Sequence, residues 1–538
     1  MLHLIFRRSR VLGGIVLVLV VLALLFGLLA SRRAGAQSVP SFTFVYLRGA
    51  DTIGVEVVTP GANVMTGVQS MRGQPRMEWE QGHQDRVPGR LALRVFAPGA
   101  ANDAAPVQQF VFVVRGDSVV IEQMAGGTMQ TQSVAAKPGT LVLIGSSVLH
   151  ISLLANHARA LGKGSLPVLN AAGGQSLEAS VAFTGDTTTF TIAGLPIRTV
   201  WRDGVPEEIT VAPQGLRVVR AAGPVAPPSS TPVKFDYSAP ATAPYTAEAV
   251  SIPTPRGYTL AGTLTRPKGA AKVPVVITIS GSGPQERDSR LAPVPGYAIF
   301  RQVADTLGRR GIAVLRFDDR GVGESGGAAT RASATSADFA DDVHAVIAWL
   351  RARPDIDGTR VALAGHSEGG VIAPLVAARD PRVRAVALLA GPGYDGRRIL
   401  MYQNELSIRA ASGVTESQRD SIRRTVPGAL DSIARVNPWY AFFMKTDPAV
   451  ALRQIRQPVL VLQGNTDRQV SAEQADTVGA ILRGAGNHGV TVRRFEDTNH
   501  LFLPDPSGAP AGYSSLKDVA VRREVLGTLA DWMAAAMR

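Results

Sequence analysis

One short stretch of the sequence combines a nucleophile with the space that nucleophilic chemistry needs. Residues 365–369 read Gly-His-Ser-Glu-Gly, so that a glycine stands two positions before and two positions after Ser367. An apolar run, 361–364, precedes this segment, and an apolar, helix-compatible stretch, 371–378, follows it. A serine on a tight turn between a strand and a helix is held in a strained conformation, and neighbouring backbone leaves room only for glycine two positions away. We therefore expect Ser367 to be a nucleophile.

A base and an acid that would activate this serine follow it in the chain. A hydroxyl is a weak nucleophile at neutral pH, so Ser367 needs a base within hydrogen-bond reach and a carboxylate that orients the base. Asp467 follows an apolar strand predicted at 459–462, and His500 follows a strand predicted at 490–495. Serine, acid and histidine in this order, each on a loop after a strand, is the order expected for a Gly-x-Ser-x-Gly turn. These three residues are the predicted catalytic set.

Other residues compete for the same roles. Glu496 and Asp497 are weaker rivals for the acid. Taken alone, Asp467 could equally cap a helix that begins near Ser471. His488 lies before the last predicted strand, which makes it a poorer base than a histidine placed after that strand.

The negative charge that forms during attack on a carbonyl needs two backbone N–H groups. We expect one from Glu368, directly after the serine. The other is expected from the glycine-rich loop at 279–284, where we assign Ser282, with Gly283 as the rival. A second glycine-rich segment, 316–325, lacks the Gly-Lys-Ser/Thr ending of a phosphate loop, so we predict a structural turn with buried ion pairs there.

The elements that must position these residues follow from the hydrophobic pattern of the C-terminal half. Apolar strands alternate with amphipathic helices, which predicts an α/β fold with a mostly parallel sheet covered on both faces. The expected strands are 260–265, 274–279, 313–317, 361–364, 383–389, 459–462 and 490–495, and the main expected helices are 299–309, 338–351, 371–378 and 520–537.

A mainly helical interruption at about 395–450 is predicted to form a cap over the site. It carries an aromatic cluster that would either line a substrate pocket or attach the cap to the core, namely Trp439, Tyr440, Phe442 and Phe443.

The N-terminal half has a different pattern. Residues 41–220 consist of short segments with alternating polar and apolar residues between Gly, Asp, Asn and Pro, which predicts an antiparallel β-rich domain. One stretch, 147–161, is compatible with a helix. A linker rich in Pro and Ala, 221–246, separates this domain from the α/β domain at 247–538. The sequence does not indicate a function for the β-rich domain, and its partner stays unknown.

Composition excludes several classes of function. The chain of 538 residues contains no cysteine, which rules out disulfides, thiolate metal sites and a cysteine nucleophile. The net charge of +13 comes from arginines that are scattered rather than clustered among aromatic residues, so nucleic-acid binding is not expected. We expect neither a metal nor a cofactor at the site.

The first 36 residues are typical of an export signal. Arg7, Arg8 and Arg10 precede an uncharged apolar run, 11–30, and a small-x-small sequence, 34–36, follows. Cleavage after residue 36 is the favoured interpretation. The apolar run is also about long enough to span a bilayer as an uncleaved anchor. In both cases the positive charges predict that the rest of the chain lies outside the cytoplasm, in the periplasm or the extracellular space.

Four motifs together resemble the α/β-hydrolase superfamily, in particular bacterial esterases grouped with serine aminopeptidase-like hydrolases. They lie at 281–288, 319–325, 365–369 and 437–439, and the resemblance covers about 248–538. It implies a metal-independent acyl-enzyme mechanism on carboxylic esters, with Ser367, Asp467 and His500 as the triad. We expect the substrate to be a small-molecule ester with a small or medium acyl group.

Two alternatives stay open. One is a peptidase that removes N-terminal residues from short peptides by the same mechanism. The other is a binding or scaffold protein in which the hydrolase domain is vestigial. A prolyl-oligopeptidase is disfavoured because a propeller needs roughly 40 or more residues per blade, and the β-rich segment is too short for many blades.

Overall fold

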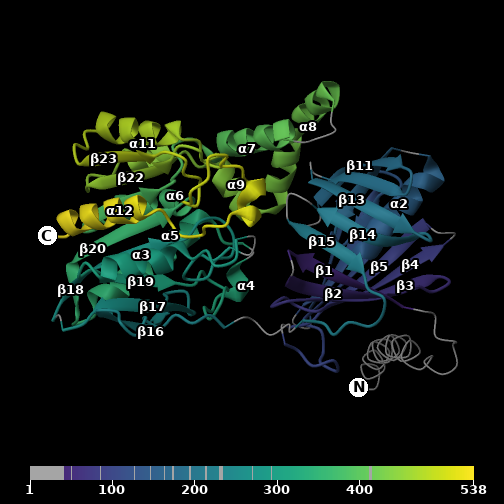
Figure 1. Ribbon diagram of the computed structural model, residues 1–538, viewed down its shortest axis with the longest axis horizontal. Coiled ribbons are helices and arrows are strands. Elements are labelled where there is room, and N and C mark those ends of the chain that lie inside the picture. Colours follow the sequence, from purple (N-terminus) through teal and green to yellow (C-terminus); the bar gives the residue numbers. More distant parts are fainter. Residues whose placement is uncertain are drawn as a thin grey trace, which may run out of the picture. The chain divides into compact units, whose positions relative to one another are not determined.

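The computed structural model contains two sheets, one from each half of the chain (Figure 1). The structure describes residues 41–538 except 50, 85–86, 98, 126–127, 146, 163, 172–174, 193–194, 212–214, 229–233, 270, 292–293, 332 and 411–414. The predicted export signal or anchor at 1–36 lies outside the described residues. Among the residues that are described, no helix has the length and apolarity needed to cross a membrane.

Among the described residues, the N-terminal sheet has fifteen strands in the order β8-β7-β6-β5-β4-β3-β2-β1-β15-β14-β13-β12-β11-β10-β9. Consecutive strands are therefore neighbours except β8 and β9, which form the two edges, and β1 lies beside β15. The predicted β-rich class is confirmed for this part of the chain. The strands are β1 (Phe42–Arg48), β2 (Asp51–Thr59), β3 (Val64–Met71), β4 (Met77–Gln84), β5 (Val87–Val95), β6 (Gln108–Arg115), β7 (Ser118–Ala125), β8 (Thr128–Ala135), β9 (Leu141–Leu143), β10 (Ser165–Asn170), β11 (Gln175–Thr184), β12 (Thr187–Ile192), β13 (Leu195–Arg202), β14 (Val205–Val211) and β15 (Leu216–Arg220).

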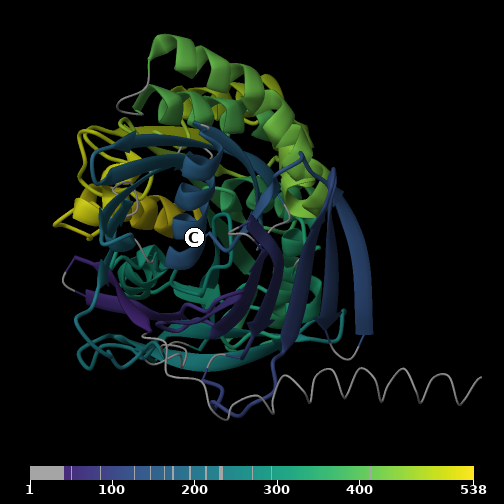
Figure 2. The same cartoon turned by 90° about the vertical axis from the view of Figure 1, so that its right-hand side faces the viewer.

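In the described part of residues 41–220 one α-helix is present, α2 (Val148–Leu161), which Figure 2 draws in blue, and nine of its residues are buried. Its N-terminus meets the fully buried side chain of Glu56 on β2. The Glu56 carboxyl accepts hydrogen bonds from Ser147 Oγ at 2.6 Å, from Val148 N at 2.8 Å and from the Tyr46 hydroxyl. Burial raises the pKa of Glu56. The carboxyl thus supplies the acceptor that the start of a buried helix needs.

The C-terminal sheet has eight strands in the order β16-β17-β19-β18-β20-β21-β22-β23. Six strands, β19, β18, β20, β21, β22 and β23, run parallel to one another. β17 pairs antiparallel with β19, and β16 pairs antiparallel with β17 at the edge of the sheet. The predicted mostly parallel α/β sheet is confirmed. The strands are β16 (Tyr245–Pro253), β17 (Thr259–Pro267), β18 (Val273–Ile279), β19 (Ala313–Phe317), β20 (Ile356–His366), β21 (Ala385–Leu389), β22 (Val459–Gly464) and β23 (Val490–Phe495).

Helices cover both faces of this sheet, because each central strand carries apolar side chains on its two sides. Val275 and Ile277 of β18 belong to a core with α5, α6 and α11, whereas Val276 of the same strand belongs to a core with α3 and α12. Successive side chains of a strand point to opposite faces, which explains the division. The helices are α3 (Ile299–Gly308), α4 (Ala328–Arg331), α5 (Ser336–Arg351), α6 (Gly369–Arg379), α10 (Pro448–Leu452), α11 (Glu473–Gly484) and α12 (Arg523–Ala536), and η2 (Pro510–Ser515) is a 3₁₀ turn.

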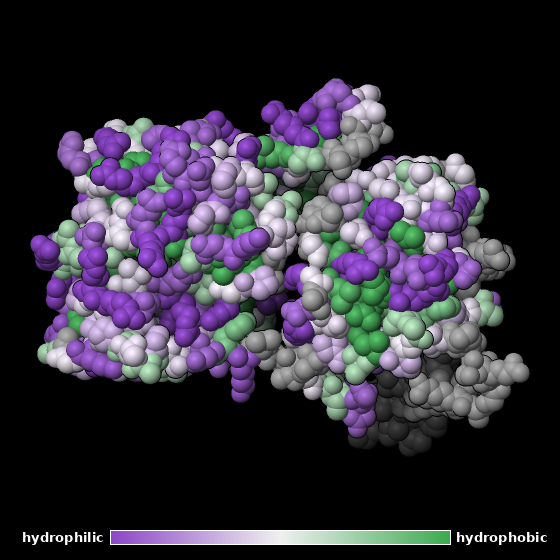
Figure 3. Space-filling model, in the orientation of Figure 1, coloured by the Kyte–Doolittle hydropathy of each residue, from purple (hydrophilic) through white to green (hydrophobic). Residues whose placement is uncertain are grey.

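Three further helices form the segment predicted to be a cap: α7 (Gly396–Ala410), α8 (Glu416–Val436) and α9 (Pro438–Lys445). They pack around a small apolar cluster of Ile408, Val426, Leu430 and Met444. The outer part of α8, at the top of Figure 1, is mainly hydrophilic in Figure 3. The three helices therefore have a core of their own.

The second half of the predicted linker packs on the α/β domain. The Tyr237 hydroxyl donates a hydrogen bond to Glu286 at 2.9 Å, and the Arg287 guanidinium lies 4.2 Å from the centre of the Tyr237 ring. Phe235 lies in the same way beneath Arg290, at 4.3 Å. Two aromatic residues thus fix a segment whose composition is otherwise that of a linker.

We predict that Glu56→Ala lowers the free energy of unfolding of the full chain's β-rich domain by about 2–4 kcal/mol, because buried donors around the helix start lose their acceptor. Urea unfolding followed by circular dichroism measures the change. Glu122→Ala, at an exposed site on β7, serves as the control and is expected to stay within about 0.5 kcal/mol of the wild type. Equal losses in the two variants would contradict the role of Glu56.

Candidate active site

Ser367 lies on a sharp turn between β20 and α6. Its φ is +55°, a left-handed conformation that is strained for a residue with a side chain. A Cβ on Gly365 would overlap the Gly369 carbonyl, and a Cβ on Gly369 would overlap the Ile279 carbonyl. The turn is held by hydrogen bonds from Ser367 N to Leu389 O at 2.9 Å and from Gly370 N to Ser367 O at 2.8 Å. The two flanking glycines are therefore required by backbone packing.

Asp467 and His500 are brought together from loops that follow β22 and β23. His500 Nδ1 lies 2.7 Å from Asp467 Oδ2, and both side chains are buried. The other carboxylate oxygen, Asp467 Oδ1, accepts hydrogen bonds from Gln469 N at 2.7 Å and Val470 N at 2.9 Å, while Gln463 Nε2 donates to Oδ2 at 2.8 Å. These hydrogen bonds hold the Asp467 carboxylate in one orientation. Because Asp467 contacts Nδ1 of His500, the other ring nitrogen, Nε2, is available to another partner.

Ser367 and His500 line one pocket of about 410 Å³, together with Ser282 and Glu368. Among the hydrogen bonds of the described residues, none joins Ser367 Oγ to His500, although both residues form the wall of the same pocket. Hydrogen bonds of this kind are often long in enzymes without substrate and shorten when substrate binds. Four of the five residues singled out in the sequence therefore face one cavity, and the fifth, Asp467, lies behind His500.

The loop predicted to bind a negative charge lies directly against the serine. A Cβ on Gly281 would lie 3.1 Å from the Ser367 Cβ, so that a larger residue would press on the Ser367 side chain. Gly283 has a φ of +89°, which favours glycine. The loop is glycine-rich because its backbone must approach the serine closely.

The two residues that competed with Asp467 for the role of the acid lie outside the pocket. Glu496 and Asp497 are exposed, and a Glu496 carboxylate oxygen accepts a hydrogen bond from Asn465. His366 is buried, and its Nε2 lies 2.9 Å from the main-chain oxygen of His500. Burial lowers the pKa of His366 to about 3, so this ring is neutral and supports the loop that carries His500. Within the described part of the chain, no group of three or more His, Cys, Asp or Glu residues is arranged to hold a metal ion.

The aromatic residues of the cap are divided between the two predicted roles. Trp439 and Phe443 line the pocket that contains Ser367, and their rings stack with centroids 5.4 Å apart. Trp439 Nε1 donates a hydrogen bond to Glu368 Oε1 at 2.8 Å, and Ser336 Oγ donates to the same oxygen at 2.6 Å. Glu368 therefore connects α9, α5 and the turn that carries Ser367.

The glycine-rich segment after β19 is a turn with buried ion pairs, as its sequence predicts. Arg287 contacts Asp318 through two hydrogen bonds, Nε to Oδ1 at 3.0 Å and Nη2 to Oδ2 at 2.8 Å. Arg320 Nε donates to Asp342 Oδ2 at 2.7 Å. These pairs fix the position of Asp319, which lies between Asp318 and Arg320 in the chain.

Asp319 holds both ends of the loop at 280–285, a role that the sequence did not reveal. Its Oδ1 lies 2.8 Å from Ser280 Oγ, and its Oδ2 accepts a hydrogen bond from Gln285 N at 3.1 Å. Burial raises the pKa of Asp319 to about 8, and the charges of Glu368 and Asp318 act in the same direction. At neutral pH the carboxyl is therefore mainly protonated, and its O–H can donate to Ser280 while the other oxygen accepts from Gln285.

We predict that Asp319→Asn removes a pH dependence of stability. An unfolded aspartate has a pKa of about 3.9. Between that value and about 8 the folded chain holds a proton that the unfolded chain has released, so the wild type loses stability as the pH rises. Asparagine reproduces the hydrogen bonds of the protonated carboxyl and does not ionise. The variant and the wild type should have similar free energies of unfolding near pH 4, and the variant should be more stable at pH 8.

Chemical denaturation at these two pH values measures the difference. Asp476→Asn, on the exposed side of α11, is the matched control and is expected to follow the wild type. A variant Asp319→Asn that loses stability with pH as steeply as the wild type would show that Asp319 is ionised throughout.

Comparisons with known proteins agree with the resemblance seen in the motifs. The model of the family described as "Serine aminopeptidase, S33" matches residues 296–419. Esterase EstD of Thermotoga maritima is 26% identical over 282 residues, which are 51% of this chain and 65% of that protein. Thiohydrolase apmlB of Arthrinium phaeospermum is 34% identical over 92 residues, 17% of this chain and 30% of that protein. The chain thus spans less than two thirds of the length of each relative.

Solved structures also match about half of this chain. The Pyrococcus furiosus esterase Pf2001 has a TM-score of 0.37 and 17% identity, over 55% of this chain and 94% of that one. Est1E from Butyrivibrio proteoclasticus has a TM-score of 0.36 and 17% identity, over 54% of this chain and 99% of that one. The two sequence comparisons confirm the resemblance predicted from the motifs: the C-terminal region is similar to the serine aminopeptidase-like α/β hydrolases, and the chain is similar to an esterase.

Proposed function

We propose that the C-terminal domain is a serine hydrolase that cleaves carboxylic esters through an acyl-enzyme intermediate. The observation that carries the proposal is the Asp467–His500 hydrogen bond at 2.7 Å beside a pocket shared by His500 and the strained Ser367. His500 Nε2 takes the proton of Ser367 Oγ as the oxygen attacks the ester carbonyl. The N–H groups of Glu368 and Ser282 bind the oxygen that becomes negatively charged.

The same residues complete the reaction. His500 returns the proton to the alcohol that leaves, and the acyl group stays bonded to Ser367. Water, deprotonated by His500, then attacks the acyl carbon and releases a carboxylic acid and the free serine. Asp467 holds the Nδ1–H of His500 and stabilises the imidazolium that forms in each half of the reaction.

The pocket wall favours esters with a neutral, mainly apolar acyl group of small or medium size. Apolar and aromatic residues form a large part of the wall, among them Leu291, Val294, Ile399, Leu400, Trp439, Phe443 and Leu501. Glu368 is the only carboxylate among the lining residues that the structure describes, and it is already bonded to Ser336 and Trp439. An N-terminal ammonium group of a peptide would need an acidic partner, so this wall favours esters over peptides.

For the whole chain we propose export. Positive residues before an apolar run at 11–30 support secretion or anchoring by that run, with the two domains outside the cytoplasm.

We predict that Ser367→Ala abolishes turnover of p-nitrophenyl butyrate by the purified full chain, because the residue that carries the acyl group is removed. A loss of about 10³-fold or more in kcat is expected. Ser407→Ala, at an exposed position on α7, should retain wild-type turnover. Unchanged turnover in Ser367→Ala would exclude the proposed nucleophile.

We also predict that the wild type hydrolyses p-nitrophenyl butyrate at least about 100-fold more efficiently than leucine p-nitroanilide, because the wall offers no free carboxylate for the ammonium group. Comparison of kcat/KM for the two substrates tests this. Faster cleavage of the anilide would identify an aminopeptidase. If well-folded protein cleaves neither substrate, the result would favour a vestigial hydrolase domain with a binding role.

A further inference from the structure

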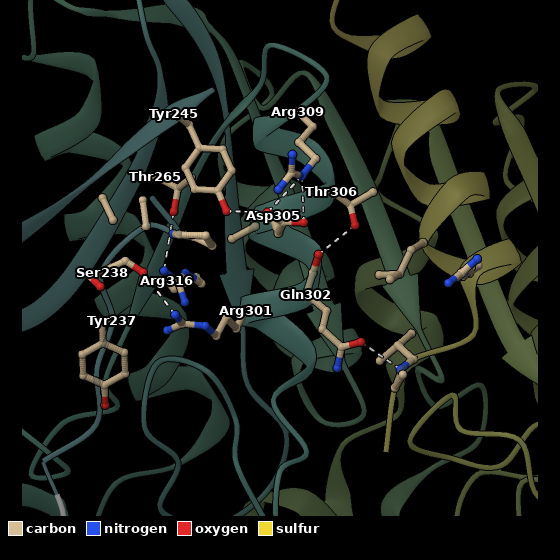
Figure 4. Close-up of a pocket in the computed structure, with 18 residues that line it drawn as sticks. Tyr237, Ser238, Tyr245, Thr265, Arg301, Gln302, Asp305, Thr306, Arg309 and Arg316 are labelled. Atoms are coloured by element: carbon tan, nitrogen blue, oxygen red, sulfur yellow. Dashed lines mark hydrogen bonds and ion pairs between the residues drawn. The ribbon is translucent and has the colours of Figure 1, made fainter. Parts of the chain in front are cut away.

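A second pocket of about 440 Å³ lies in the α/β domain, away from the serine pocket, and no step of the proposed reaction uses it. It is bounded by the segment at 237–240, the first residues of β16, α3 and the start of α12. Four arginines line it, compared with one carboxylate, Asp305. Figure 4 shows Arg301 and Arg316 reaching into the same part of this pocket, near the paired side chains of Asp305 and Arg309.

The single acid of the pocket is already neutralised. Asp305 pairs with Arg309 Nε at 3.0 Å and accepts a hydrogen bond from the Tyr245 hydroxyl at 2.6 Å. These contacts lower the pKa of Asp305, against the effect of its partial burial. The Asp305 carboxylate is therefore already paired and does not balance the charge of the other arginines.

The remaining arginines have too few acidic partners. Arg316 is buried and pairs with Asp288, and its Nε has no hydrogen-bond partner among the described residues. Arg301 reaches Asp288 only at 4.0 Å, while Arg290 contacts the same carboxylate at 2.8 Å. Arg290 has a second acidic partner, Glu286, at 3.1 Å. Arg301 and Arg316 share the Asp288 carboxylate with Arg290, which leaves an excess of positive charge at this wall of the pocket.

Arg523 adds a further positive charge at the start of α12. Its side chain is exposed, and among the residues that the structure describes no ion pair joins it to an acid. Arg301, in contrast, is oriented by the main chain, because its Nη2 donates to Ser238 O at 3.1 Å and its Nη1 donates to Asp236 O. Oriented guanidinium groups beside a cavity are suited to a planar anion such as a carboxylate.

Apart from Ser238, Thr265, Gln302 and Thr306, the other lining residues of the pocket are mainly apolar. They include Pro240, Tyr245, Ala247, Ala304, Val521 and Leu526. A bare inorganic anion would leave these surfaces in contact with water, whereas an anion with a hydrocarbon body would cover them. The volume lies within the range of small-molecule sites.

We propose that this pocket binds an organic anion with a short apolar body, of the class of medium-chain carboxylates. The anionic group lies between Arg301, Arg316 and Arg523, and the hydrocarbon part lies against Tyr245, Ala247 and Leu526. The site is separate from Ser367, and the proposal holds whether or not the serine pocket hydrolyses esters.

Isothermal titration of the full chain with sodium octanoate tests the proposal. Arg523→Ala should weaken binding about tenfold, because a charge-assisted contact is lost. Ala247→Phe should abolish binding by filling the pocket. Arg493→Ala, an exposed arginine outside the pocket, and Leu400→Trp, which fills the serine pocket, should both bind octanoate as the wild type does.

Three outcomes would overturn the proposal. Binding that survives in both Arg523→Ala and Ala247→Phe would show that octanoate does not use this pocket. Binding lost in Leu400→Trp but kept in Ala247→Phe would assign octanoate to the serine pocket. Inorganic phosphate that binds more tightly than octanoate, and loses affinity in Arg523→Ala, would show that the apolar walls do not select the ligand. Circular dichroism of each variant verifies that it is folded.

Discussion

The arrangement of the α/β domain depends on one backbone conformation, the φ of +55° at Ser367. A residue held in this way projects from the turn between β20 and α6, and it can be held only where neighbouring backbone compensates the strain. The Gly369 and Ile279 carbonyls occupy the space that side chains at 365 and 369 would need. The loops that follow β18, β22 and β23 then meet at this same end of the parallel sheet, and they bring the other residues of the site to the serine.

Buried polar and charged groups support the end of the sheet at which these loops meet. Asp319 holds both ends of the loop beside Ser367, and Glu368 links the Ser367 turn to α9 through Trp439. Arg287 fixes the turn that carries Asp319. Buried ion pairs are costly unless their geometry is well satisfied, and here each acid has two or more partners. The supporting contacts thus give the site a fixed shape before any substrate arrives.

Much of this architecture could be predicted from the sequence, because the signals are local. A run of apolar residues followed by a polar loop marks the end of a buried strand, and Asp467 and His500 both follow such runs. The contact of Asp319 with Ser280 and Gln285 could not be predicted, since it arises only because β18 and β19 are neighbours in the sheet. β16 begins inside a segment whose prolines and alanines indicate a linker, and only the pairing with β17 reveals it. In the β-rich domain, the alternation predicted strands, whereas the joining of β1 to β15 depends on contacts distant in sequence.

The central claim, that Ser367 is an activated nucleophile, is tested most directly by covalent labelling. The purified full chain is treated with a fluorophosphonate, and the modified peptide is located by mass spectrometry. The account predicts one adduct, on Ser367, with labelling at least about 100-fold slower in His500→Ala because the base is lost. Labelling that proceeds at the same rate without His500, or that falls on another serine, would contradict it.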